Sequence, residues 1–170
     1  MDRVKPRAEG NKSVTDRRGV GMGGRIMKVA SILKSKGSSV ATTPPNTTIF
    51  TVTWDLKLKG IGALVVTEDG NTVLGLISER DIVRGLTEHG PKLLALPVSQ
   101  VMTSPVITCT PDDSITTVMG LMTRYRIRHV PVVDGGRLCG IVSIGDVVKH
   151  RLDELEMEGN ILRETLFASH

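Results

Sequence analysis

The sequence predicts a mixed α/β fold of two tandem β-α-β-β-α units followed by a C-terminal helix. The main observation is a duplicated pattern of glycine, two apolar residues, serine, two variable residues and aspartate. It reads Gly75-Leu76-Ile77-Ser78-Glu79-Arg80-Asp81 and again Gly140-Ile141-Val142-Ser143-Ile144-Gly145-Asp146. Upstream of both copies, proline and apolar positions recur at a spacing of 66 residues. A tandem copy of one supersecondary unit indicates that neither copy buries its apolar face alone, so we expect one shared core and two related clefts.

Each unit has the same order of elements. An extended lead-in covers residues 39–43 or 106–110, and proline with side-chain oxygens follows at 45–48 or 111–114, which predicts a helix N-terminus. Apolar residues with helical spacing come next, at 49–56 and 115–122. A strand (63–66; 130–133), a turn with Asp-Gly, a second strand (73–77; 138–142) and a helix opened by Asp81 or Asp146 complete the unit.

The end of the chain departs from the repeat. Leucines and one glycine are spaced 3, 4, 3 and 4 residues apart, at Leu152, Leu155, Gly159, Leu162 and Leu166. This pattern predicts a long helix with a narrow apolar seam that continues the helix after Asp146. About two heptads are too short for an independent coiled coil, so we expect the seam to pack against a partner subunit. The predicted organisation is a tail at 1–28, unit 1 at 29–92, unit 2 at 93–152 and this helix at 153–170.

Composition narrows the function classes. The chain is 39% hydrophobic and only 2% aromatic, so the core must consist of Val, Ile, Leu and Met. Residues 1–28 carry a net charge of +5 and the remaining 142 residues sum to −1, so the folded part is not a basic nucleic-acid binder. No apolar run approaches the roughly 18 residues of a membrane span. Cys109 and Cys139 have no metal or redox spacing, which indicates a reducing, cytoplasmic location.

The basic tail is rich in glycine and polar residues and has no periodicity, so we expect it to be disordered. Three other interpretations of the tail are open. It is a basic arm for an anionic partner, a solvated tail, or a segment added by an upstream start of translation when the natural protein begins near Met27. A mitochondrial targeting peptide is disfavoured by three acidic residues and the lack of an amphipathic stripe.

The duplicated serine and aspartate lie at a strand-to-helix junction. The two oxygens of an aspartate can each accept a hydrogen bond, which matches a vicinal diol such as ribose. The serine hydroxyl and backbone N–H lie near a helix N-terminus, which favours anions such as phosphate. The alternative is that Ser78 with Asp81, and Ser143 with Asp146, only cap their helices.

A basic cluster enters the first strand of unit 2, at Arg124, Arg126, Arg128 and His129. Either it is a solvated edge that discourages strand pairing, or it is a phosphate clamp. Unit 1 has glycine and alanine at the corresponding positions, whereas Arg80 stands where unit 2 has Gly145. We therefore expect two related but unequal sites.

These features together resemble a tandem pair of CBS (cystathionine β-synthase) domains, the Bateman module, over residues 29–152. The resemblance rests on the duplicated motif, on Val101-Met102-Thr103 with its weak echo Ile32-Leu33-Lys34, and on the strand Arg128-His129-Val130-Pro131-Val132. It implies two units related by a pseudo-twofold axis, usually as a stand-alone module. It also implies adenosine-type ligands: AMP first, with ATP, ADP or NAD(H) possible and S-adenosylmethionine in some members.

The resemblance also implies roles for individual residues. Asp81 and Asp146 would hold the ribose diol, and Ser78 and Ser143 would contact phosphate. The remaining ligand-binding positions that it implies are Arg128, His129 and Pro131 on the phosphate-facing strand, Thr42 and Thr108 in the lead-ins, and Arg80. Ala63-Leu64-Val65 replaces the corresponding His-Val-Pro in unit 1, which weakens the expectation of phosphate binding there.

Three functions compete on this pattern. The first is a non-enzymatic adenine-nucleotide sensor that signals to an unknown regulated protein, without a required metal and without a membrane or nucleic-acid partner. The second is a dimeric interaction protein with vestigial pockets. The third, a small nucleotide hydrolase, is disfavoured because the sequence has no P-loop and no His or Cys at metal or nucleophile spacing. We also expect a homodimer, because the helices of a two-layer fold would expose apolar faces.

Overall fold

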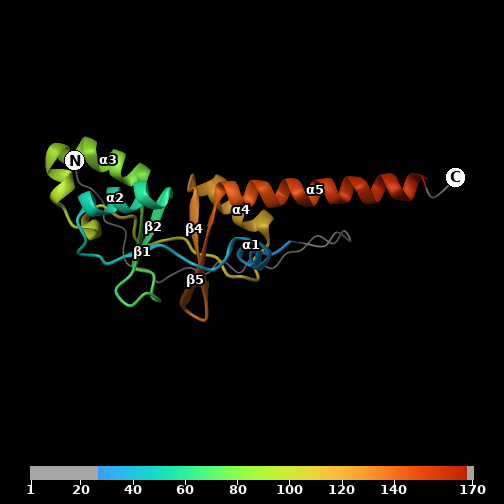
Figure 1. The fold of residues 1–170 in the computed structure, drawn as a ribbon, viewed down its shortest axis with the longest axis horizontal. Helices are drawn as coiled ribbons and strands as arrows, with labels where there is room; N and C mark the ends of the chain where they lie inside the picture. Colours follow the sequence, from blue (N-terminus) through green and yellow to red (C-terminus); the bar gives the residue numbers. More distant parts are fainter. Residues whose placement is uncertain (1–26, 168–170) are drawn as a thin grey trace.

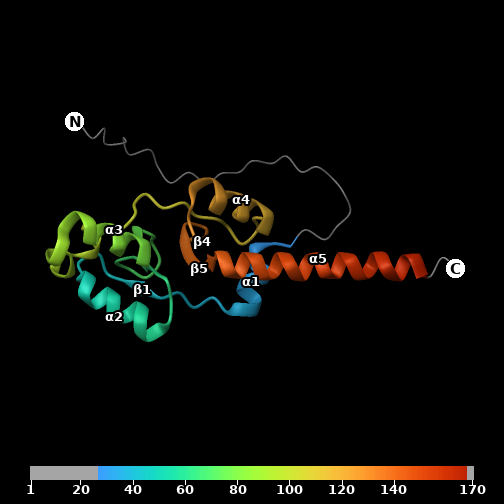
Figure 2. The same ribbon diagram turned by 90° about the horizontal axis from the view of Figure 1, so that it is seen from above.

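The structure, a computed structural model, describes residues 27–167. Its helices are α1 (Val29–Lys36), α2 (Ile49–Lys59), α3 (Glu79–His89), the 3-10 helices η1 (Gly90–Ala95) and η2 (Val98–Gln100), α4 (Ile115–Tyr125) and α5 (Ile144–Phe167). The strands are β1 (Thr42–Thr43), β2 (Ala63–Val66), β3 (Gly75–Ser78), β4 (His129–Asp134) and β5 (Arg137–Ser143). Figure 1 and Figure 2 show the two units side by side along the long axis, with α2 to α5 on one side of the strands.

Unit 1 has the predicted β-α-β-β-α order, and unit 2 follows it except that its predicted lead-in strand, 106–110, forms a single bridge and not a strand. In unit 1, β1 is parallel and β3 antiparallel to β2. In unit 2, β4 and β5 are antiparallel, and Cys109 of the lead-in bridges Val132 in parallel. Thr43 pairs with Val66 in the same way in unit 1, so the two sheets repeat one topology.

The helices α2 and α4 start where the sequence predicts. Thr48 and Ser114 are their N-caps, and each side chain accepts a hydrogen bond from a backbone N–H three residues on. The prediction that Asp81 and Asp146 open the next helices is wrong by two residues, because α3 starts at Glu79 and α5 at Ile144. Each aspartate is instead the third residue of its helix, where its carboxylate can reach back to the serine before the helix.

The first segment of each unit packs on the other unit, an exchange that the sequence pattern does not predict. Before α4, Ile115 N donates to Met27 O over 3.0 Å, so the chain leading into α1 lies at the start of a unit 2 helix. Before α2, Ile49 N donates to Leu96 O over 2.9 Å, so the chain leading into η2 lies at the start of a unit 1 helix. Consequently α1 completes the core of unit 2 and η2 completes the core of unit 1.

The motif glycines lie where the exchanged segments meet the sheets. A Cβ atom at Gly75 would lie 2.3 Å from Met102 Sδ, and one at Gly140 would lie 2.5 Å from Leu33 Cδ2. Leu33 and Met102 thus occupy equivalent positions, in line with the weak echo between the two lead-ins. Only glycine leaves room for these side chains, so the first residue of each motif serves packing between the units.

The two sheets also share a core. Ala63, Val65 and Leu76 are buried with partly buried apolar residues of the unit 2 lead-in and β5, among them Val106 and Ile141. The buried apolar side chains are mainly valine, isoleucine, leucine and methionine, as the low aromatic content predicts. The buried residues thus form three clusters, one in each unit and one shared between the two sheets, so the predicted single core is wrong in number although part of the core is shared. Cys109 and Cys139 are free thiols, and burial raises the pKa of Cys109 to about 12.

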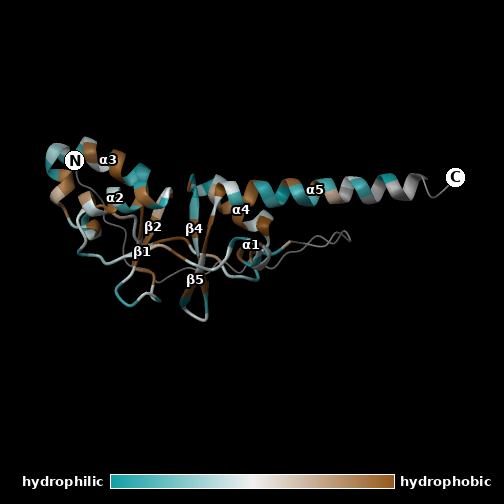
Figure 3. Ribbon diagram, in the orientation of Figure 1, coloured by the Kyte–Doolittle hydropathy of each residue, from teal (hydrophilic) through white to brown (hydrophobic). Residues whose placement is uncertain are grey.

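The predicted C-terminal helix is confirmed as the last turns of α5. The first part of α5 contacts α1, α4 and β5, and both views show that its C-terminal part continues beyond the rest of the fold. Leu152 and Leu155 of the seam are exposed, and Figure 3 shows brown bands between teal ones along this helix. The predicted disorder of the basic tail concerns residues 1–28, of which 1–26 lie outside the described residues.

Candidate functional site

In unit 2 the strand β5 brings Ser143 to the start of α5, one turn before Asp146. Asp146 Oδ2 accepts hydrogen bonds from Ser143 N over 2.8 Å and from Ser143 Oγ over 2.7 Å. Asp146 N in turn donates to Ser143 Oγ over 3.2 Å. This reciprocal pair is a capping box, so the helix-capping alternative describes a real structural role. Among the described residues, all hydrogen bonds to this carboxylate end on Oδ2, which leaves Oδ1 available to a ligand.

Asp146 also has a cationic partner that the sequence reasoning missed. Lys36 Nζ, at the end of α1, donates to Asp146 Oδ2 over 2.6 Å and to Ile141 O over 3.3 Å. Burial raises the pKa of Asp146, but hydrogen bonds from Lys36 and Ser143 lower it more, so the pKa lies below its ordinary value. The Lys36 and Asp146 side chains are 38% and 22% exposed, so water and ligands can reach the pair.

In unit 1 the corresponding aspartate has a neutral partner. Asp81 Oδ2 accepts from Ser78 N over 2.9 Å and from Ser78 Oγ over 2.5 Å. Asp81 Oδ1 accepts from Thr103 Oγ1 over 2.9 Å, and Thr103 N donates to Leu76 O over 2.9 Å. Leu76 corresponds to Ile141 in the repeat, so Thr103 and Lys36 both bind the motif aspartate and an equivalent carbonyl. Thr103 is neutral and binds Asp81 Oδ1, whereas Lys36 is charged and binds Asp146 Oδ2.

His129 lies where the two units meet. It is opposite Ser143 in the β4–β5 ladder, and its Cε1 would be 3.1 Å from a Cβ atom at Gly62 of unit 1. Burial lowers the pKa of His129 and Lys36 lowers it further, although Glu79 and Asp146 act in the opposite direction. The lowered pKa disfavours the charged imidazole, which argues against His129 as a second cation beside Arg128.

The arginines of the candidate site take different positions. Arg80 Nη1 donates to Arg126 O over 2.6 Å, so this unit 1 side chain reaches across to the end of α4. Arg126 has a φ of 54°, where unit 1 has Gly60 with a φ of 62°. The Arg128 carbonyl accepts from Ile144 N over 2.8 Å, which positions Arg128 beside the start of α5, and its residue is exposed.

The remaining predicted positions lie on the adjoining strands. Thr42 pairs with Val65 in β1–β2 and is half-buried. In unit 2, the half-buried Thr108 precedes Cys109, whose N–H donates to Pro131 O over 3.1 Å. The structure therefore gathers Ser143, Asp146 and His129 at one place and sets the unit 2 lead-in beside them. The weak lead-in echo pairs Thr103 with Lys34, so it could have pointed to Thr103 but not to Lys36.

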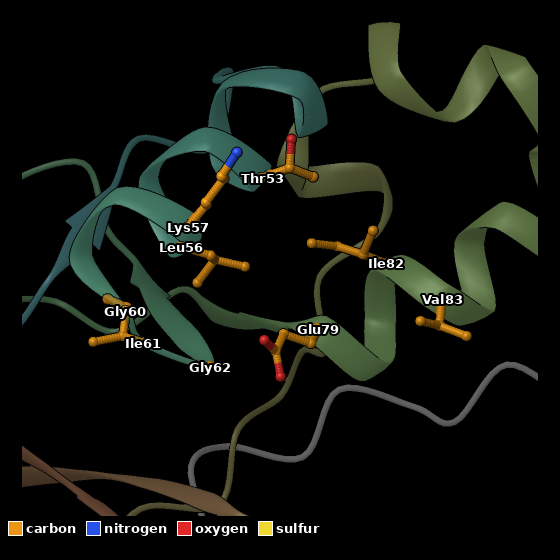
Figure 4. A pocket seen from close by; sticks show the side chains of 9 residues that line it. All are labelled: Thr53, Leu56, Lys57, Gly60, Ile61, Gly62, Glu79, Ile82 and Val83. Atoms are coloured by element: carbon orange, nitrogen blue, oxygen red, sulfur yellow. The ribbon is translucent and has the colours of Figure 1, made fainter.

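A hollow of roughly 570 Å³ lies elsewhere in unit 1, between α2 and α3. Figure 4 shows Leu56 and Lys57 of α2 on one side and Glu79 and Ile82 of α3 on the other. Its lining includes Glu79, which lies between the motif residues Ser78 and Asp81, but neither of those two.

Metal binding and membrane insertion depend on the side-chain clusters and the helices of residues 27–167. Within this range, no three His, Cys, Asp or Glu side chains come together in a group suited to a metal ion. In the same range, every helix is too short or too polar to cross a membrane.

Known proteins share this architecture. The family model described as "CBS domain" matches residues 29–88 and 98–153. The chain is 35% identical over 131 residues to the CBS domain-containing protein CBSX3, mitochondrial, of Arabidopsis thaliana, covering 71% of this chain and 63% of that protein. It is 32% identical over 134 residues to the CBS domain-containing protein YhcV of Bacillus subtilis, covering 79% of this chain and 94% of that protein.

Solved structures agree with these sequence matches. The CBS-domain containing protein ATU1752 from Agrobacterium tumefaciens superposes with a TM-score of 0.71 at 42% identity, covering 74% of this chain and 99% of that chain. The CBS domain pair of protein MJ0100, solved in complex with 5′-methylthioadenosine and S-adenosyl-L-methionine, superposes with a TM-score of 0.68 at 27% identity. That comparison covers 76% of this chain and 99% of the other. With two matched domains, a duplicated motif and the exchanged packing of its units, this chain belongs to the CBS-domain family as a tandem pair.

Proposed function

We propose that this chain is a non-enzymatic regulatory module that binds adenine nucleotides and signals their presence to a protein partner. The observation that carries the proposal is the pair of carboxylates, Asp81 and Asp146, each held by a serine at a strand-to-helix junction. In the unit 2 cleft, Asp146 Oδ1 is free of hydrogen bonds from the described residues and can accept one from a ribose hydroxyl.

The surroundings of Asp146 support a phosphorylated ligand. The start of α5 contributes the positive end of its helix dipole, and Lys36 and Arg128 supply positive charge within the same region. The nucleotide that we propose first is AMP, with ADP, ATP or NAD(H) as related candidates and no required metal. The complex of the MJ0100 domain pair with two adenosine derivatives supports this class of ligand. His129, Pro131 and Thr108 would line the same cleft, and Thr42, Ser78 and Arg80 belong to the proposed unit 1 site.

The proposal is tested by removing the carboxylate of Asp146. Asp146→Ala should weaken AMP binding by about 1.5–3 kcal/mol, the usual value for a hydrogen bond to a charged group. Isothermal titration calorimetry of the full chain measures the change, and Asp153→Ala, on an exposed part of α5, is the matched control. Unchanged affinity in Asp146→Ala would show that the site assignment is wrong.

The alternative function is a dimeric interaction protein whose pockets are vestigial. A panel of adenosine, AMP, ADP, ATP, NAD and S-adenosylmethionine separates the two, because a ligand that binds only the folded state stabilises it by about 2.7 kcal/mol at 100 times its Kd. A thermal shift with at least one nucleotide supports the sensor. No shift with any of them supports the interaction protein.

A homodimer is part of the proposal under either function. The exposed apolar residues of the helix layer are Phe50, Trp54 and Leu58 on α2, Val83 and Leu86 on α3, and Val148, Leu152 and Leu155 on α5. A second copy that packs on this layer would bury the outer faces of the helices around residues 49–56 and 115–122 together with the C-terminal seam. The apolar stripes that the sequence indicates on these two helices are already buried within one copy. Deleting residues 153–170 should lower dimer stability in light scattering while nucleotide binding persists. A monomer at micromolar concentration would contradict this part of the proposal.

A reducing, cytoplasmic location belongs to the same proposal, since both cysteines are free thiols.

A further inference from the structure

The contact between Lys36 and Asp146 has a consequence for ligand choice, which rests on the proposed nucleotide function. Three donors converge on one oxygen, Asp146 Oδ2: Ser143 N, Ser143 Oγ and Lys36 Nζ. A vicinal diol donates two hydrogen bonds, and it fits a carboxylate most directly with one bond to each oxygen. Because Oδ2 already has three donors, a diol that uses both oxygens must displace one of them.

Lys36 is the donor that can leave. The two bonds from Ser143 belong to the capping box and hold the start of α5, whereas Lys36 is at the end of α1 on an exposed residue. Gly37 follows it directly and has a φ of 92°, so the chain leaves the helix at this point. The lysine has a long, flexible side chain, and its ammonium can move by several ångströms without a change in the backbone.

Displacing the ammonium has a cost that depends on the ligand. Once Lys36 leaves Asp146, it loses its carboxylate partner, and only Ile141 O remains beside it. A ligand with a phosphate offers the ammonium a new anionic partner, whereas a neutral nucleoside offers none and a cationic ligand repels it. The cleft of unit 2 should therefore discriminate between ligands by their charge.

We infer that Lys36 is a displaceable counter-ion of Asp146 that selects phosphorylated ligands for the unit 2 cleft. The unit 1 aspartate has no such counter-ion among the described residues, because its additional donor is the neutral hydroxyl of Thr103, which binds the other oxygen, Asp81 Oδ1. A hydroxyl can leave a carboxylate without stranding a charge, and it can donate to or accept from the ligand. Unit 1 should therefore accept neutral and positively charged adenosine derivatives with less discrimination.

The test compares AMP with adenosine, which share the base and the ribose and differ in the phosphate. Titrations use the full chain with Lys36→Gln, which removes the charge and retains a polar side chain. Lys34→Gln is the matched control, because Lys34 is exposed on the same helix. Each is measured alone and combined with Asp81→Ala, so that binding at unit 2 can be assigned.

In the wild-type chain and in Lys34→Gln, we expect unit 2 to prefer AMP over adenosine. In Lys36→Gln the ratio of the two affinities should fall about tenfold, corresponding to about 1.4 kcal/mol, with weaker AMP binding and stronger adenosine binding. An unchanged ratio in Lys36→Gln overturns the role of Lys36 and leaves the nucleotide function intact. A wild-type chain that binds neither compound overturns the proposed function and this inference together. The reciprocal variant Thr103→Lys should introduce a preference for AMP at unit 1. A Thr103→Lys variant whose unit 1 site still binds AMP and adenosine equally would also contradict the inference.

Discussion

The motif aspartate of each unit receives one further donor from an exchanged segment, but the two donors differ in charge and bind different carboxylate oxygens. In unit 1, Thr103 binds the motif aspartate and the neighbouring carbonyl through a hydroxyl and a backbone N–H. In unit 2, Lys36 binds the equivalent aspartate and carbonyl through one ammonium. Both donors come from exchanged segments, so each cleft is completed by chain that precedes the other unit in sequence. The framework of the two motif sites is thus the same, while the residue from the exchanged segment sets the charge beside the aspartate.

A second contrast concerns the helix layer. Unit 1 presents Phe50 and Trp54 on α2, whereas the positions 66 residues later on α4 are Thr116 and Gly120. An added Cβ at Gly120 would have no atom within 4 Å, so this part of α4 is an open notch. The apolar surface available to a second copy is therefore larger over unit 1, and the two ends of the module are not interchangeable as interfaces.

The largest expected effect comes from filling the space at the motif glycines. Gly75→Val and Gly140→Val would each force a side chain into Met102 or Leu33, at distances from 2.3 to 2.5 Å for the first added atom. Overpacking of this kind typically costs about 1–3 kcal/mol in the free energy of unfolding. Urea denaturation measures it for both variants. Gly120→Ala is the control and should raise stability by up to about 1 kcal/mol, because it lies in a helix with open space around it.

This first experiment also tests the equivalence of the exchanged segments. If both glycines serve the same packing role, the two losses should be similar in size. A loss at Gly75 with no loss at Gly140 would show that α1 adapts to the added side chain and that only η2 is closely fitted.

A titration of the wild-type chain should resolve the difference between the clefts. We expect two classes of AMP site, because Lys36 and Arg128 lie at the unit 2 site whereas Thr103 lies at the unit 1 site. A separation of about tenfold in affinity corresponds to 1.4 kcal/mol and is resolvable by calorimetry. Two equal and independent sites would remove the distinction between the units. Asp81→Ala and Asp146→Ala then assign each class to its cleft.

The acid stability of the chain should depend on Lys36. The pKa of Asp146 is lowered in the folded state, so the folded chain loses stability as the pH falls from the unfolded value of about 3.9 through the folded pKa. Above that range the interaction is fully present. Lys36→Gln should cost roughly 0.2–1 kcal/mol at pH 7, because the pair is partly exposed. The difference from wild type should shrink at lower pH, and a difference that grew on acidification would contradict the ion pair.

Much of this architecture was predictable because the same short sequence signals occur in both units. Thr48 and Ser114 cap their helices at the positions that the sequence indicates, and the strand Ala63–Val66 has the predicted bounds, since four consecutive apolar residues follow a glycine. The motif carboxylates were recognisable because Ser-x-x-Asp occurs twice. The exchange of segments was not predictable in the same way, because residues 27–36 and 96–102 contact the chain far from themselves in sequence. Lys36 was missed for this reason, and the charge of His129 was misjudged because it depends on burial between the units.

The smallest expected effect concerns His129. Its pKa is lowered by burial and by Lys36, and Arg128 acts in the same direction, while Glu79 and Asp146 oppose them. The unfolded chain, with a histidine pKa of about 6.5, therefore binds this proton before the folded chain does. Stability from the uncharged imidazole is fully present above pH 6.5 and is lost as the pH falls through the folded pKa. The slope from one such group cannot exceed about 1.4 kcal/mol per pH unit.

His129→Gln should flatten this part of the profile, since glutamine fills a similar space and does not titrate. Urea denaturation between pH 7.5 and 5 compares the two slopes, and His89→Gln, at the exposed end of α3, is the control for a histidine far from the interface. Because His129 lies beside unit 1 residues while it belongs to unit 2, a flatter slope would locate the pH response at the contact between the units. A slope that changed in His89→Gln and not in His129→Gln would instead place the titrating group outside this contact.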